Sequence, residues 1–112
     1  MENGRKFFYD ICGEIVGALK EKGGKAPYLE FLDTIRFVLK KYNIDGNAEN
    51  PVWWALVSDP NTHIIEYHTG DILKGKIDSS LKLVGELDDN FVRNSEKNVD
   101  IFVQRTKHLA SV

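Results

Sequence analysis

The chain has 112 residues, 42% of them hydrophobic, so a single domain spanning residues 1–112 has enough apolar material for a packed core. Its 15 basic and 17 acidic residues give a net charge of −2. Proteins that neutralise many phosphates usually carry a basic excess, so this balance disfavours nucleic acid as the main partner. Cys12 is the only cysteine, which excludes an intrachain disulfide. No apolar run reaches the roughly 20 residues of a membrane span, and we expect a cytoplasmic protein without a membrane partner.

Two amphipathic helices are expected in the first 42 residues. Apolar residues recur at helical spacing over residues 7–19 and again over residues 28–42. Gly23-Gly24 is expected to end the first helix, because glycine readily takes the left-handed conformation found at helix C-termini. Pro27 suits the first turn of the second helix. The short linker between the two helices predicts an antiparallel pair.

Gly13 and Gly17 lie about one turn apart on the first predicted helix. Glycine lowers helix stability by about 1 kcal/mol relative to alanine. Its presence in a helix therefore suggests that another element packs closely against the helix at that position. We therefore expect the two glycines to form a groove in which the second helix or a sheet packs closely.

A β-hairpin is expected after the loop of residues 43–51. Residues 52–57 (VWWALV) are aromatic and β-branched, residues 59–62 (DPNT) are typical of a turn, and residues 63–69 alternate in polarity. Because strand side chains alternate in facing, the hairpin would have a core face and a mixed face. The core face would carry Val52, Trp54, Leu56, Ile65 and Tyr67. The mixed face would carry Trp53, Ala55, Val57, Ile64, Glu66 and His68.

The remaining chain gives weaker patterns. Residues 77–91 fit either a helix or a strand, and the sequence leaves both open. We expect a helix over residues 99–109, because apolar residues recur there at helical spacing and residues 104–110 contain neither glycine nor proline. The predicted fold is α+β: an N-terminal antiparallel helical hairpin packed on a small antiparallel sheet, with a C-terminal helix.

Residues 70–76 (GDILKGK) have the spacing of a phosphate-binding loop. In the working motif the next residue is a Ser or Thr that holds Mg²⁺, and here it is Ile77. The motif also follows a buried parallel strand rather than a hairpin strand. The segment is therefore interpreted as a polar connection, and no cofactor is expected.

His63, Glu66 and His68 place a carboxylate between two histidines. On a strand, His63 and His68 point to opposite faces, whereas Glu66 and His68 share one face. A catalytic zinc site needs at least three protein ligands, and the sequence supplies two. Glu66 and His68 therefore give an alternative hypothesis, a small metal-dependent or acid–base enzyme, with the metal left unassigned.

The main functional hypothesis comes from Trp53 on the mixed face of the hairpin. If that face is uncovered, Trp53, Ile64, Glu66 and His68 form an aromatic patch with a polar fringe, as at protein interaction sites. If the C-terminal segments cover it, Trp53 belongs to a second core layer. We expect a protein-binding module (an adaptor, an inhibitor or an immunity-type protein) rather than an enzyme, and a homo-oligomer is left open.

Overall fold

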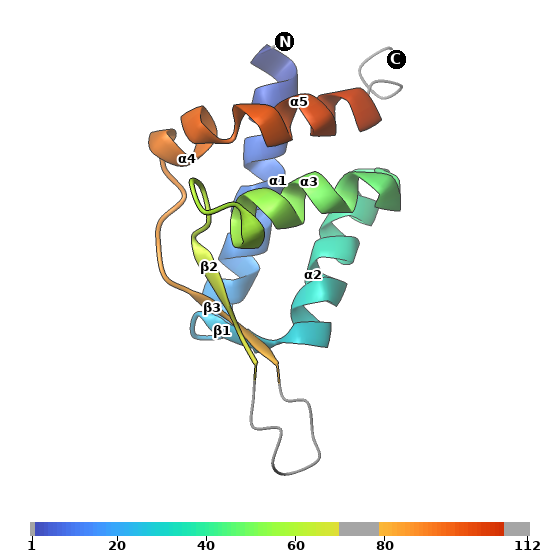
Figure 1. Cartoon of the computed structure of the whole chain (residues 1–112). Coiled ribbons are helices and arrows are strands. Elements are labelled where there is room, and N and C mark those ends of the chain that lie inside the picture. Colours follow the sequence, from blue (N-terminus) through green and yellow to red (C-terminus); the bar gives the residue numbers. More distant parts are fainter. Residues whose placement is uncertain (1, 70–78, 107–112) are drawn as a thin grey trace.

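The structure is a computed structural model that describes residues 2–69 and 79–106 (Figure 1). The first half of the chain forms α1 (Glu2–Glu21), β1 (Lys25–Pro27), α2 (Tyr28–Lys41), the 3₁₀ turn η1 (Gly46–Ala48) and α3 (Glu49–Trp53). The second half of the chain forms the π-helical turn η2 (Trp54–Ser58), β2 (Ile65–His68), β3 (Ser80–Leu83), α4 (Asp89–Asn94) and α5 (Glu96–Arg105). The α+β class, the N-terminal helix pair and the C-terminal helix are confirmed. No helix of the described residues is long and apolar enough to cross a membrane.

The first helix ends at the glycine pair and the second helix begins beside Pro27, as the sequence predicts. Gly23 and Gly24 both have a φ of +82°, and the N–H of Gly24 donates to the carbonyl of Leu19 at 2.9 Å. This left-handed pair stops α1 and turns the chain, and α2 starts directly after Pro27. In Figure 1, α1 and α2 run in opposite directions, with the sheet across one end of the pair.

The predicted groove at Gly13 and Gly17 is wrong. A Cβ at Gly13 would lie 3.7 Å from the side chain of Leu87, in the segment after β3, which is an ordinary contact distance. A Cβ at Gly17 would meet nothing within 4 Å in the described part of the chain. Neither glycine is needed for the approach of a second helix or of the sheet.

The sheet is small and fully antiparallel, in the order β1-β3-β2. Leu81 of β3 is opposite Ala26 of β1 and Tyr67 of β2. Leu81, Ala26 and Ile65 are buried against the helices, so one side of the sheet closes the core. For residues 80–83 the structure therefore selects the strand and not the helix. The phosphate-loop pattern of residues 70–76 and Ile77 lies outside the described residues.

The predicted hairpin is wrong, because residues 52–57 are helical and only β2 of its two strands exists. The chain does turn after Ser58, since the N–H of His63 donates to the carbonyl of Asp59 at 2.8 Å, but it turns from a helix into a strand. Ala48, Val52, Ala55 and Leu56 are all fully buried. Their spacing is that of a helical face, and this face packs into the core.

Because residues 52–57 are helical, the burial of the two tryptophans is the reverse of the prediction. Trp54, predicted in the core, is 54% exposed. Trp53 is half-buried, with its ring centroid 5.9 Å from that of Tyr28 and 6.0 Å from that of Phe31. Successive helical residues point about 100° apart rather than in opposite directions, so the sorting expected for a strand does not apply.

Aromatic rings join α1 to the C-terminal helices. The ring of Phe8 is edge-on to Phe102 of α5 at 5.3 Å between centroids and stacks with Phe91 of α4 at 6.4 Å. Cys12, one turn further along α1, is fully buried, and this burial raises the pKa of its thiol. A buried thiol with a raised pKa is usually unreactive, because the thiolate is the reactive form.

Candidate functional site

The four residues predicted to form one binding face lie in different environments. Ile64 is only 7% exposed, and its N–H donates to the carbonyl of Leu56 at 3.0 Å. Trp53 packs against α2, as described above. Glu66 and His68 are exposed on β2, one of the two edge strands of the sheet. Because the hairpin is absent, no shared strand face joins Trp53 to the other three, and their role in binding stays a prediction.

Glu66 and His68 are side by side, as their spacing on a strand predicts. The Nε2 atom of His68 lies 3.3 Å from the Oε2 atom of Glu66, with both side chains about half exposed. Among the described residues, no group of three His, Cys, Asp or Glu side chains is close enough to hold a metal ion. The pair is therefore a two-residue arrangement on an open edge of the sheet.

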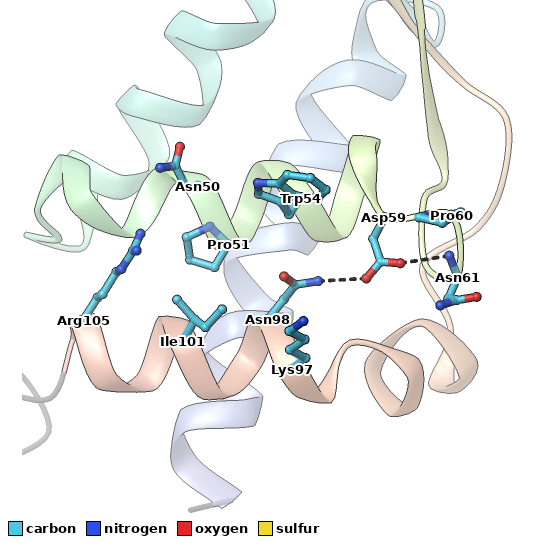
Figure 2. A pocket seen from close by; sticks show the side chains of 10 residues that line it. All are labelled: Asn50, Pro51, Trp54, Asp59, Pro60, Asn61, Lys97, Asn98, Ile101 and Arg105. Atoms are coloured by element: carbon cyan, nitrogen blue, oxygen red, sulfur yellow. Dashed lines mark hydrogen bonds between the residues drawn. The ribbon is translucent and has the colours of Figure 1, made fainter.

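A groove of about 520 Å³ opens between α3–η2 and α5 (Figure 2). Its upper wall in Figure 2 carries Pro51 and Trp54, and its lower wall carries Lys97, Asn98, Ile101 and Arg105 of α5. The turn after η2 closes one end. The full set of lining residues is Asn50, Pro51, Trp54, Asp59, Pro60, Asn61, Lys97, Asn98, Ile101 and Arg105.

The π-helical turn is part of the groove wall. The N–H of Asp59 donates to the carbonyl of Trp54 at 2.7 Å, which is the five-residue spacing of a π-helix. Such turns are rare and are frequent at functional sites. Here the wide turn holds Trp54 at its start, with a largely exposed indole, and Asp59 directly after its end.

The carboxylate of Asp59 is held by two donors. One oxygen accepts the N–H of Asn61 at 2.9 Å, and the other accepts the side-chain amide of Asn98 at 3.3 Å. A carboxylate only accepts hydrogen bonds, so it fixes the Asn98 amide with its nitrogen toward Asp59. Figure 2 shows the Asn98 oxygen on the opposite side of the amide, away from Asp59. Asn98 is 7% exposed, so this acceptor is rigidly placed.

The positive charge of the groove comes from both ends of α5. Lys97 lies near its N-terminus and Arg105 is its last residue, with Ile101 midway between them. Arg105 donates to the carbonyl of Asn47 at 2.6 Å, which ties the end of α5 to η1. Asp59 is the one acidic residue among the described residues that line the groove.

None of the residues that line this groove is among the binding residues predicted from the sequence. The sequence predicts Trp54 on the core face of a strand and Asp59 in the turn of a hairpin. One signal was present: the buried spacing of Ala48, Val52, Ala55 and Leu56 is helical, and on such a helix Trp54 falls outside the buried face. The partner wall on α5 lies some forty residues further along the chain, and no local pattern connects the two.

No protein-family model matches the chain, and neither a curated protein nor a solved structure is significantly similar to it.

Proposed function

We propose that this chain is a small protein-binding module, of the adaptor, inhibitor or immunity type, that holds a segment of a partner protein in the groove between α3–η2 and α5. The observation that carries the proposal is Trp54, a large aromatic side chain 54% exposed at the groove. Tryptophan is the residue type most enriched at binding hot spots, where its ring gives much apolar contact for little loss of conformational freedom.

Both walls of the groove are anchored in the core and are joined to each other, which supports a docking role. Val52, Ala55 and Leu56 anchor its upper wall in the core, and Val99 and Phe102 anchor α5. The Asp59–Asn98 hydrogen bond joins the two walls directly. A rigid site of this kind loses little conformational entropy on binding, so more of the contact energy appears as affinity.

The proposal includes the features expected from the sequence: another protein as the partner, a cytoplasmic location, and neither cofactor nor catalysis. It leaves a homo-oligomer open. The predicted contribution of Trp53, Ile64, Glu66 and His68 to binding is not required by this groove, because none of the four lines it.

Replacement of Trp54 by alanine is expected to weaken binding at least about tenfold while leaving the fold intact. Peptides are first selected on the wild-type protein from a displayed library of random dodecapeptides, and their dissociation constants are then measured for wild type and variant. The matched control is Phe37→Ala on α2, an aromatic side chain 70% exposed that does not line the groove. If no selected peptide depends on Trp54, or if Phe37→Ala has the same effect, the groove is not the binding site.

A second candidate function is the small acid–base or metal-dependent enzyme, and the 3.3 Å contact between His68 and Glu66 favours it. A histidine paired with a carboxylate is a frequent element of acid–base and metal sites. Equilibrium dialysis with Zn²⁺ separates this candidate from the first: stoichiometric binding that is lost in His68→Ala supports it, and an absence of binding removes its metal-dependent form.

A further inference from the structure

We infer that the segment held in the groove is an acidic peptide in extended conformation, with an apolar side chain flanked two residues away on each side by Asp or Glu. This inference rests on the proposed function and specifies its partner. The α5 wall carries a repeating pattern: Lys97, Ile101 and Arg105 recur at every fourth position and so lie along one face of the helix. Two cations therefore bracket one apolar side chain.

The spacing of this pattern matches an extended peptide. Lys97 and Arg105 are separated by about 12 Å along the axis of α5, at about 1.5 Å per residue. An extended chain advances about 3.3 Å per residue, so residues four apart are separated by about 13 Å. Side chains two and four positions apart also point to the same side of an extended chain. The carboxylates of an acidic-x-apolar-x-acidic segment thus reach both cations while the central side chain faces Ile101.

Apolar and polar groups of the groove fit the same segment. The central apolar side chain enters between Ile101 on one wall and Pro51 and Trp54 on the other (Figure 2). The Asn98 oxygen, turned away from Asp59 by their hydrogen bond, is an acceptor for a peptide N–H. An extended peptide presents such N–H groups along its whole length, whereas a helix uses them internally.

The described residues that line the groove keep a net positive charge, because the cations Lys97 and Arg105 outnumber the single carboxylate of Asp59. Asp59 accepts hydrogen bonds on both of its oxygens. Glu96, next to Lys97, is paired with Arg5 of α1 at 3.0 Å, and Glu49 is paired with Arg36 of α2 at 3.2 Å. Lys97 makes no ion pair with any residue that the structure describes.

Charge at this rim sets selectivity rather than the bulk of the affinity. Exposed ion pairs contribute little each, and salt screens them. Apolar contact with Trp54 and Ile101 supplies most of the binding, and the two cations discriminate between peptides that make this contact equally well.

The test uses three decapeptides with the same central Ala-Leu-Ala, flanked by Glu, by Gln or by Lys. Dissociation constants come from titrations of the ¹⁵N-labelled protein followed by NMR. We expect the Glu peptide to bind at least about fivefold more tightly than the Gln peptide and the Lys peptide most weakly, with the preference shrinking as salt is raised. Lys97→Glu is expected to abolish the preference. Lys25→Glu on β1 makes the same charge change at the opposite end of the molecule and is expected to retain it (Figure 1).

The outcomes separate this inference from the proposed function. If the three peptides bind equally well and this binding is lost in Trp54→Ala, the acidic preference is overturned. The proposed docking groove is then still supported. A preference for the Glu peptide that survives Lys97→Glu overturns the role of α5. Failure of all three peptides overturns the inference, and the proposed function then also fails if the displayed library yields no Trp54-dependent binder.

Discussion

Replacement of Phe102 by alanine is expected to lower the free energy of unfolding by about 3–5 kcal/mol, the largest effect of any substitution considered for this protein. Phe102 is fully buried on α5, with its ring centroid 5.3 Å from that of Phe8 and 5.9 Å from that of Phe7. Truncation removes the ring from this aromatic contact and leaves a cavity that the two α1 rings cannot fill without moving. Urea-induced unfolding followed by circular dichroism measures the loss.

The control for this substitution is Phe37→Ala, since Phe37 has the same side chain and is 70% exposed on α2. It is expected to change the free energy of unfolding by no more than about 0.5 kcal/mol. A loss below about 1 kcal/mol in Phe102→Ala would contradict the packing of α5 on α1, and the groove would then lack a firmly held lower wall.

Replacement of Gly85 by alanine is expected to destabilise the protein by about 1–3 kcal/mol, because it overpacks a closely packed site. Gly85 lies after β3, and its N–H donates to the carbonyl of Ile64 at 3.1 Å. A Cβ at this position would lie 3.0 Å from Cγ2 and 3.2 Å from Cβ of Ile64. Ile64 is itself buried and cannot move outward without breaking its own contacts. The shift of the urea midpoint at constant slope measures the effect.

Gly17→Ala is the matched control for this prediction, with the opposite sign expected. In the described part of the chain nothing lies within 4 Å of a Cβ added at Gly17, which is inside α1. Alanine there should stabilise the protein by up to about 1 kcal/mol, because it favours the helix over glycine. A neutral or stabilising Gly85→Ala would mean that the segment after β3 does not lie against Ile64.

The elements predicted correctly are those whose signals are local and repeated. The apolar stripes of α1 and α2 each persist over several turns, and the glycine pair between them has a direct conformational cause in its positive φ angles. The helix α5 is also predicted from the spacing of its apolar residues, and Ser95 is its N-cap. In each of these cases propensity, apolar period and end signals agree.

The hairpin prediction is wrong because core packing, and not local strand preference, decides the conformation of residues 52–57. Residues 52–57 are aromatic and β-branched, which favours a strand locally. Ala48 lies outside that window, and with it Val52, Ala55 and Leu56 form a helical face of buried residues. Proline is tolerated in the first turn of a helix, and Pro51 lies in the first turn of α3. Burial of this face in the core outweighs the local strand preference.

The groove was beyond prediction from sequence for a different reason. Its walls come from α3–η2 and from α5, and their relative position depends on how both pack against α1 and on the hydrogen bond between Asp59 and Asn98. No local pattern in residues 54–58 indicates the π-helical turn that places Trp54 and Asp59. The pairing of Glu66 with His68 was predictable, because alternate residues of a strand share a face whatever the rest of the fold does.

We propose that Trp54, and not Trp53, is the tryptophan presented for binding. It is tested most directly by acrylamide quenching of fluorescence in two single-tryptophan variants, since the chain has two tryptophans. In Trp53→Phe the remaining Trp54, 54% exposed, is predicted to be quenched strongly and to be protected when the Glu-flanked peptide is added. In Trp54→Phe the remaining Trp53, packed on Tyr28 and Phe31, is predicted to be quenched several-fold less, with or without peptide. The reverse order of quenching would contradict the helical geometry of residues 49–58, and the groove would be lost with it.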